Sequence, residues 1–209
     1  MRTMALRKKG IRSASHYAMA RIMEMEDMNV LISQYPAIAA KAAELGKIKQ
    51  GMLNKKQYAQ SIEQWKSFTP EELAKLNSEI ASAPVVMKKA VFTQTAICYM
   101  SECCFHCVPV KDLVWVYARI VKESMNFIPT NKMHQLWMMD RNGSHFLVAM
   151  LNTGAFSKKA PASDAVEAMA QLLKPVRPGI IFGYSKEIEA FCNSNPAAAA
   201  QKVDTDSQL

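Results

Sequence analysis

The first third of the chain shows apolar side chains at helical spacing. Tyr58, Ile62 and Trp65 lie at i, i+4 and i+7, and therefore share one face of a predicted helix. A methionine-rich segment at about 16–33 and an alanine-rich segment at about 37–47 are predicted to be helical as well. Methionine at helical spacing usually fills a core, so a promiscuous peptide groove is the less favoured interpretation.

Residues 69–80 carry the clearest local signal, which is that of a helix start. Thr69 can cap the helix, Pro70 suits its first position, and Glu72 can reach back to complete a capping box. Three apolar residues then follow on one face, namely Leu73, Leu76 and Ile80. The sequence therefore predicts a helix that begins at Pro70.

The spacing changes to that of strands near residues 82–87. Short runs of β-branched, aromatic and cysteine residues follow, and they are KKAVFT, AICYM, CFHCVPV, DLVWVYARIV, HQLWMM and SHFLVAM. Asn142-Gly143 lies between the last two runs and is a strong hairpin signal. Residues 88–151 are therefore predicted to form a meander of about six antiparallel strands.

Helices return towards the end of the chain. A segment from about Ser163 to Leu173 has one apolar face and is followed by two prolines. A short apolar strand, GIIFGY at 179–184, comes next, and Ser185 is placed to cap a further helix. The remaining residues have no apolar face, so 194–209 are expected to be a flexible tail.

The order of these elements predicts an α+β fold. A helical N-terminal region precedes an antiparallel β-meander, which is followed by C-terminal helices. The change in spacing places the helical region at 1–86, the β-domain with its C-terminal helices at 87–193, and the tail at 194–209. A chain of 209 residues can hold one large domain or two small ones.

The net charge of +8 is concentrated near the N-terminus. Residues 1–12 hold five basic residues and no acid, whereas the rest of the chain carries 21 basic and 18 acidic residues. A strongly basic nucleic-acid-binding surface should keep its positive charge when residues 1–12 are left out. Here most of the excess positive charge lies in those residues.

Hydropathy and cysteine usage point to the cytoplasm. No uninterrupted apolar run of about 18 residues is present, so we expect no membrane span. The basic N-terminus lacks the apolar core of a secretory signal; a solvated or helical basic tail is the favoured interpretation and an organelle transit peptide the alternative. Four of the five cysteines lie within 98–107, whereas a disulfide framework would spread them along the chain.

The segment SECCFHCVPV at 101–110 is the most suggestive chemically. Alternate side chains of a strand share a face, so Cys104 and His106 are expected together, whereas Cys103 and Cys107 lie roughly 13 Å apart. Cys104 and His106 would supply two of the four usual ligands of a zinc ion. The other ligands would have to come from elsewhere, with His16, Cys98, His134, His145 and Cys192 as candidates.

A reactive Cys104 thiol with His106 as its base is a second chemical interpretation of this segment. Catalytic cysteine and histidine normally meet from different elements, and no third group that would orient the histidine is evident. We therefore favour a buried strand in which cysteine acts as a small hydrophobe, and we expect no cofactor.

An aromatic strand face offers a candidate binding site. Trp115, Tyr117 and Arg119 alternate along one predicted strand and share a face. Exposed aromatic and basic side chains in this arrangement are typical of base-stacking platforms, although a half-buried strand gives the same alternation. The phosphate-binding motifs GxGxxG and GxxxxGK[ST] are absent from the sequence, and no carboxylate pair suggests acid–base catalysis.

Three motifs of the β-region occur in a recognisable order: the strand KDLVWVY, the hairpin DRNG and the late segment PGIIFGYSKE. Over about 88–192, this arrangement resembles an uncharacterised bacterial family with a small, PH-like β-domain. The resemblance implies a curved half-barrel closed by a helix, a lipid, peptide or protein ligand, and no enzymatic activity. The chain departs from that pattern because Lys88-Lys89 is the only adjacent basic pair on the early strand loops, so phosphoinositide binding is not expected.

The resulting functional prediction is a non-catalytic binding or protein-interaction module in a bacterial cytoplasm. A protein partner or self-association through exposed aromatic and methionine side chains is expected. One alternative is nucleic-acid binding through residues 2–12 and the face formed by Trp115, Tyr117 and Arg119. The other is a thiol- or metal-dependent enzyme that uses Cys104 and His106.

Overall fold

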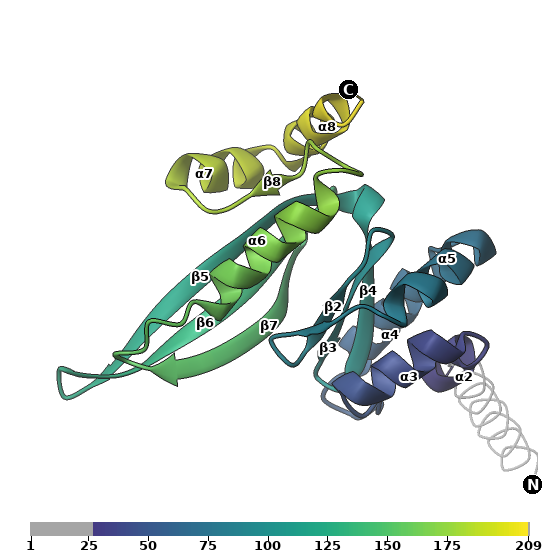
Figure 1. Cartoon of the computed structure of the whole chain (residues 1–209), viewed down its shortest axis with the longest axis horizontal. Coiled ribbons are helices and arrows are strands. Elements are labelled where there is room, and N and C mark those ends of the chain that lie inside the picture. Colours follow the sequence, from purple (N-terminus) through teal and green to yellow (C-terminus); the bar gives the residue numbers. More distant parts are fainter. Residues whose placement is uncertain (1–26, 209) are drawn as a thin grey trace, which may run out of the picture.

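A computed structural model describes residues 27–208 and shows an α+β fold (Figure 1). In this part of the chain four helices come first: α2 (Met28–Ser33), α3 (Pro36–Leu45), α4 (Lys55–Lys66) and α5 (Pro70–Ile80). Two four-stranded sheets follow and, within the described residues, do not join into a closed barrel. The predicted fold class is therefore confirmed. The basic segment 1–12 and His16 lie outside the described residues.

The small sheet is an antiparallel meander in sequence order. Its strands are β1 (Val85–Val86), β2 (Ala90–Phe92), β3 (Ala96–Ser101) and β4 (Cys104–Pro109). Because β1 pairs with β2, the predicted domain boundary at 86 and 87 falls inside this sheet. The helical region and the β-region consequently share a structural element.

The large sheet has the order β7-β6-β5-β8. A 3-10 turn, η1 (Val110–Asp112), leads into its strands, which are β5 (Leu113–Met125), β6 (Ile128–Asp140), β7 (His145–Gly154) and β8 (Ile181–Phe182). The first three pair in antiparallel fashion, and β8 pairs in parallel with β5. The predicted meander of about six strands corresponds to β2–β7, but β4 and β5 do not pair, so these strands are divided between the two sheets.

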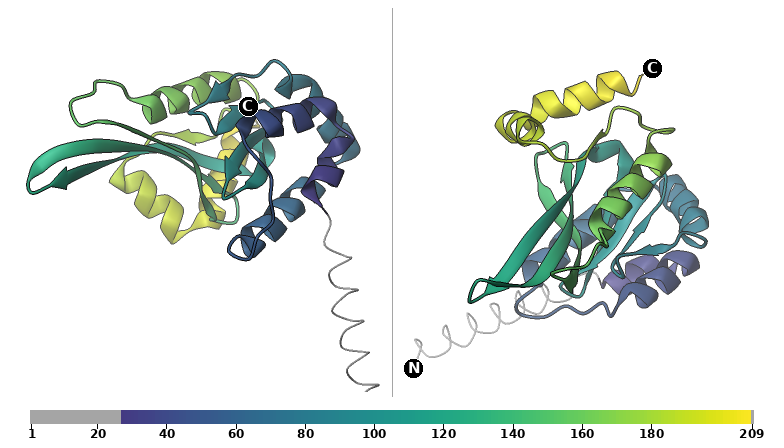
Figure 2. Two further views of the ribbon diagram at one scale, coloured as in Figure 1. Left: turned by 90° about the horizontal axis from the view of Figure 1, so that it is seen from below. Right: turned by 60° about the vertical axis from the view of Figure 1, so that its left-hand side comes forward.

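Three helices complete the chain: α6 (Pro161–Leu173), α7 (Lys186–Ser194) and α8 (Pro196–Asp206). Figure 2 shows α6 on one face of the large sheet and α7 and α8 on the other. As predicted, Ser185 caps α7, because its hydroxyl accepts a hydrogen bond from the Ile188 amide at 3.1 Å. No helix of the described residues is long and apolar enough to cross a membrane.

The small sheet lies between two hydrophobic cores. Its Cys98, Phe105 and Cys107 side chains pack with helices α2–α5. On its other face, Ile97 and Tyr99 join a core made with the large sheet, α6 and α8. Successive strand residues point to opposite faces, and this alternation lets one short sheet serve both cores.

Helix α5 begins as the sequence predicts. The Thr69 hydroxyl accepts a hydrogen bond from the Glu72 amide at 3.2 Å, and the Thr69 amide donates to the Glu72 carboxylate at 2.9 Å. Both halves of the capping box are therefore present, with Pro70 at the first helical position.

Helix α4 protects the outer edge of the small sheet. The Trp65 indole donates a hydrogen bond to the carbonyl of Phe105 at 2.8 Å, and the Cys107 amide donates to the Gln64 side chain at 3.4 Å. These contacts satisfy backbone groups of β4 that would otherwise be open to another strand.

The predicted flexible tail at 194–209 is wrong for most of its length, because residues 196–206 form α8. Asn195 caps the helix, and Ala199, Ala200 and Val203 form a narrow buried face. Gly179 lies so close that an added Cβ would come within 2.2 Å of the Val203 carbonyl oxygen. Alanine contributes little to an apolar pattern in sequence, so this face was not recognised, and the absence of a side chain at Gly179 permits the close approach.

Candidate binding surface

The predicted aromatic face is mostly buried. Trp115 has 0% exposure, its ring stacks on Tyr117 with 4.0 Å between centroids, and its indole donates to the Gly183 carbonyl at 2.7 Å. The Tyr184 ring also stacks on Trp115, at 6.2 Å. A base cannot stack on a fully covered indole, and the structure therefore does not provide the exposed platform that the sequence suggested.

Helix α7 completes this covering through polar contacts. The Tyr117 hydroxyl lies 3.3 Å from His145 Nδ1, and His145 Nε2 lies 3.0 Å from the Asn193 side chain. Burial raises the pKa of Tyr117 above its ordinary value. Only Arg119, farther along β5, is exposed, so one of the three predicted binding residues reaches solvent.

The two predicted metal or catalytic residues bind different neighbours. Cys104 is buried in the helical core, where the Asn54 amide lies 3.5 Å from its sulfur. His106 Nδ1 lies 3.0 Å from the Gln64 side-chain oxygen, and the imidazole stacks on Tyr99. Cys104 and His106 are not hydrogen-bonded to each other, and among residues 27–208 no group of three or more His, Cys, Asp or Glu side chains could hold a metal ion.

Burial moves both side chains away from reactive protonation states. It raises the pKa of Cys104 to about 11, with smaller contributions from Glu102 and Cys103, so the thiol is protonated at neutral pH. It lowers the pKa of His106 to about 4, which keeps the imidazole neutral. These shifts are opposite to those of an activated thiolate beside an imidazolium.

The remaining cysteines of the cluster are divided between a turn and the core. Cys103 is exposed in the β3–β4 turn with φ of 60°. Cys107 lies opposite Cys98 in the sheet with 3.4 Å between the sulfurs, and both thiols are buried and free. The predicted buried strand of small apolar cysteines is therefore confirmed for β4.

A group of exposed apolar side chains lies where β5 and β6 leave the body of the molecule. Figures 1 and 2 show this hairpin projecting beyond the helices. Met125 and Ile128 form its last strand pair, and Phe127 in the turn is fully exposed, with a relative exposure of 102%. Large apolar side chains in this position contribute nothing to either core.

The segment after β7 returns beside this turn. The Ala155 amide donates to the Thr130 carbonyl at 3.2 Å, and the Lys132 ammonium donates to the Ser157 carbonyl at 2.9 Å. These contacts place Phe156, with 88% exposure, at the same end of the molecule. We refer to residues 121–132 and 154–159 together as the hairpin end.

The hairpin end is basic as well as apolar. It carries four lysines and one acidic residue, which are Lys122, Lys132, Lys158, Lys159 and Glu123. No salt bridge within the described residues involves any of them. The surface therefore presents uncompensated positive charge around a cluster of apolar side chains.

Sequence patterns did not reveal this surface. The predicted strands covered DLVWVYARIV and HQLWMM, whereas the observed ones extend to Met125 and restart at Ile128. The connecting Asn126-Phe127 has no glycine, although both residues adopt positive φ, 48° and 64°. Such turns favour Asn-Gly, and the asparagine was the only local signal of the turn.

No protein-family model, curated protein or solved structure matches the chain. The resemblance to a PH-like bacterial family therefore stays a prediction.

Proposed function

We propose that this chain is a non-catalytic binding module that makes contact through its hairpin end. The observation that carries the proposal is Phe127, a fully exposed aromatic side chain held at φ of 64°. A bulky residue in the left-handed region is uncommon, because its Cβ crowds the backbone and costs about 1–2 kcal/mol.

Phe127 makes no folding contact that would offset this cost. Its side chain lies outside both hydrophobic cores, and a glycine would form the same type of turn without crowding. Lys88 and Cys103 adopt the same backbone conformation in two other turns, and Phe127 differs from them in placing a large aromatic side chain fully in solvent. The neighbouring Met125, Ile128 and Phe156 enlarge the apolar area available to a partner.

The state of the candidate catalytic residues also favours a binding role. The Cys104 thiol is protonated and buried, and His106 is neutral and already hydrogen-bonded to Gln64. Neither group has the geometry or the protonation state that nucleophilic catalysis requires.

Site-specific photo-crosslinking in cells tests the proposal. A benzophenone amino acid replaces Phe127, which is similar in shape, and the same probe at exposed Gln201 of α8 serves as the control. We expect a discrete adduct from position 127 that is absent from position 201. Identical backgrounds from both positions would contradict a binding role for the hairpin end.

A further inference from the structure

The α3–α4 loop, residues 46–54, repeats the chemistry of the hairpin end. Met52 and Leu53 at its tip have exposures of 98% and 99%. Four exposed lysines lie on the loop or in the first turn of α4, namely Lys47, Lys49, Lys55 and Lys56. The adjoining β3–β4 turn contributes one acidic side chain, Glu102, beside the loop. This second surface is therefore also an apolar tip surrounded by positive charge.

The loop is held in this shape by hydrogen bonds, most of them from the Asn54 side chain. The Asn54 side chain donates to the carbonyls of Lys49 at 2.9 Å and Glu102 at 2.6 Å, and accepts from the Gly51 amide at 2.7 Å. The Lys49 amide also donates to the Cys103 carbonyl at 2.9 Å. Because these bonds fix the base of the loop on the β3–β4 turn, Met52 and Leu53 remain outside the core.

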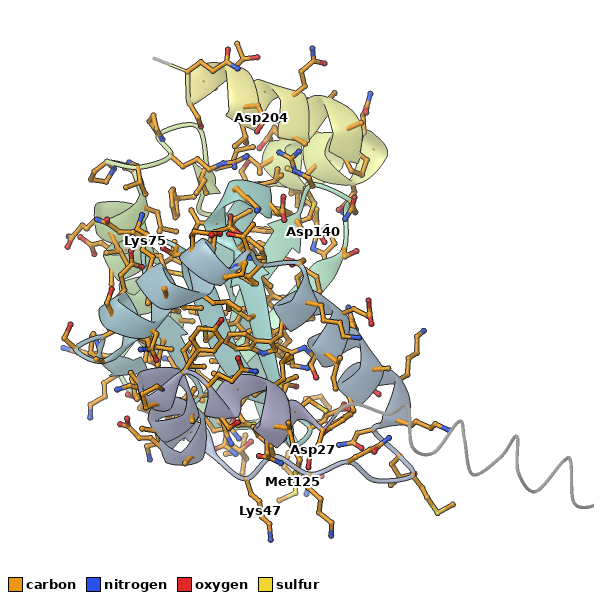
Figure 3. All side chains as sticks on the ribbon, turned by 90° about the vertical axis from the view of Figure 1, so that its right-hand side faces the viewer. Asp27, Lys47, Lys75, Met125, Asp140 and Asp204 are labelled. Carbon is orange, nitrogen blue, oxygen red and sulfur yellow. The ribbon has the colours of Figure 1, made fainter. Side chains whose placement is uncertain are left out.

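The loop and the hairpin end lie on the same side of the molecule. In Figure 1 and in the right-hand view of Figure 2, the hairpin turn and the α3–α4 loop both reach the lower side. Figure 3, seen from another direction, places Met125 and Lys47 at the lower edge of the ribbon. Two separate apolar tips can therefore contact one extended surface at the same time.

We propose that this side of the molecule docks on an anionic lipid surface, with both apolar tips inserted at the headgroup level. The inference rests on the proposed function and names the partner of the hairpin end. Phenylalanine, methionine and leucine partition into the interfacial region of a bilayer, and lysines beside them are attracted to anionic headgroups. Lysine stems can lie along the apolar layer while their ammonium groups stay at the phosphates.

The same features fit nucleic acid less well. Basic arms that follow a groove place cationic and hydrogen-bonding side chains against the phosphates, and some insert apolar wedges between base steps. Here the side chains at the tips of both elements are apolar, since Met52, Leu53 and Phe127 are the most exposed large hydrophobic residues that the structure describes. Insertion between base steps would cover only the few side chains that act as wedges, whereas a bilayer removes both apolar tips from water.

Vesicle flotation of the full chain tests the inference. The probes are vesicles of phosphatidylcholine alone and vesicles in which about a third of the lipid is phosphatidylserine. We expect flotation with the anionic vesicles, little with the neutral ones, and a decrease in bound protein as salt is raised. Absence of flotation with anionic vesicles overturns the inference.

Variants separate the two tips from the basic N-terminal segment, which could itself attract anionic lipid. Substitution of Met125, Phe127 and Ile128 by serine should weaken binding about tenfold or more, and so should M52S with L53S. Reversal of Lys158 and Lys159 to glutamate should have a similar effect. Thermal unfolding of each variant establishes that the fold is retained.

Matched controls carry the same chemical changes at other exposed positions. K174E with K186E reverses two exposed lysines, one directly after α6 and one in α7, and V176S removes an exposed apolar side chain. Neither control should change binding by more than about twofold. If the tip variants and these controls bind alike, the inference is wrong.

The two proposals fail in different ways. A position-127 adduct with a protein or a nucleic acid, together with no vesicle binding, would retain the binding module and overturn the lipid surface. Loss of both the adduct and vesicle binding would overturn the proposed function as well.

Discussion

The β5–β6 hairpin carries aromatic side chains in two regions. One region is the packed body, formed by the two hydrophobic cores, and the other is the hairpin end, and the side chains are used there in opposite ways. Trp115, near the start of β5, is completely buried and hydrogen-bonded, whereas Phe127, at the far turn, contacts neither core. Backbone pairing runs without interruption from Tyr117↔Trp137 to Lys122↔Lys132. Strand pairing therefore continues well beyond the region that packing requires, and the excess length carries apolar and basic side chains into solvent.

The largest expected difference between the two regions is in folding stability. Trp115→Ala should lower the free energy of unfolding by about 3–5 kcal/mol, because it leaves a large cavity between Tyr117 and Tyr184. Phe127→Ala should change it by no more than about 0.5 kcal/mol. Denaturant unfolding measures both. Similar losses in the two variants would show that the hairpin end packs in a way that its exposure does not indicate.

Acid should also act on the body rather than on the hairpin end. Burial lowers the pKa of His106 to about 4 in the folded protein, from 6.5 for an ordinary histidine. The unfolded chain therefore binds a proton that the folded chain rejects between these pH values, and stability falls as pH decreases through this window. The expected loss is about 3 kcal/mol in full.

Denaturant unfolding of the wild type and His106→Gln between pH 7 and pH 4 tests this contribution. A change of about 3 kcal/mol is large compared with the error of a measured free energy of unfolding. The glutamine variant should lose less stability over that range, even if it is less stable at neutral pH. Parallel pH profiles for the two proteins would contradict the assignment to His106.

The attachment of α8 to the body should have an intermediate effect. Asp204 lies 2.7 Å from Arg177, whose side chain is mostly buried, and 3.1 Å from Arg141. Asp204→Ala leaves the Arg177 guanidinium without its carboxylate and should cost about 1–2 kcal/mol. Asp206→Ala is the matched control, since Asp206 pairs only with exposed Lys202 and should cost at most about 0.5 kcal/mol. Equal melting temperatures for the two variants would mean that α8 is held by its apolar face alone.

Elements with strong local signals were predictable from the sequence. The Thr69-Pro70 helix start, the Ser185 cap and the Asn142-Gly143 hairpin each depend on residues a few positions apart. The burial of Trp115 does not depend on neighbours in sequence, because Tyr184 and Gly183 cover it from a distant part of the chain. Periodicity could place Trp115, Tyr117 and Arg119 on one face, but it could not identify which part of that face is covered.

The hairpin end was missed for a related reason. A turn formed by Asn126-Phe127 contradicts the preference for glycine at positive φ, so a local rule indicates no turn there. Within the described residues, non-glycine pairs at positive φ also form the turn at Met87-Lys88 and the β3–β4 turn at Glu102-Cys103, so the rule misses a kind of turn that this chain uses repeatedly.

The smallest expected effect is also the most informative about the turn. Phe127→Gly removes a Cβ from a residue at φ of 64°, which relieves about 1–2 kcal/mol of crowding, while glycine adds about 0.5–1 kcal/mol of entropy to the unfolded chain. Because the relief of crowding is at least as large as the entropic cost, the variant should be as stable as the wild type or more stable, by up to about 1.5 kcal/mol. Phe127→Ala retains the Cβ and should show no such gain.

Equilibrium unfolding and vesicle flotation on the same Phe127→Gly sample then address the turn directly. Higher stability together with weaker flotation would mean that the phenylalanine opposes folding and is needed for contact. Higher stability with unchanged flotation would leave the strain without a function at this residue. Lower stability would show that Phe127 makes a folding contact after all, and the distinction between the packed body and the hairpin end would no longer hold at the turn.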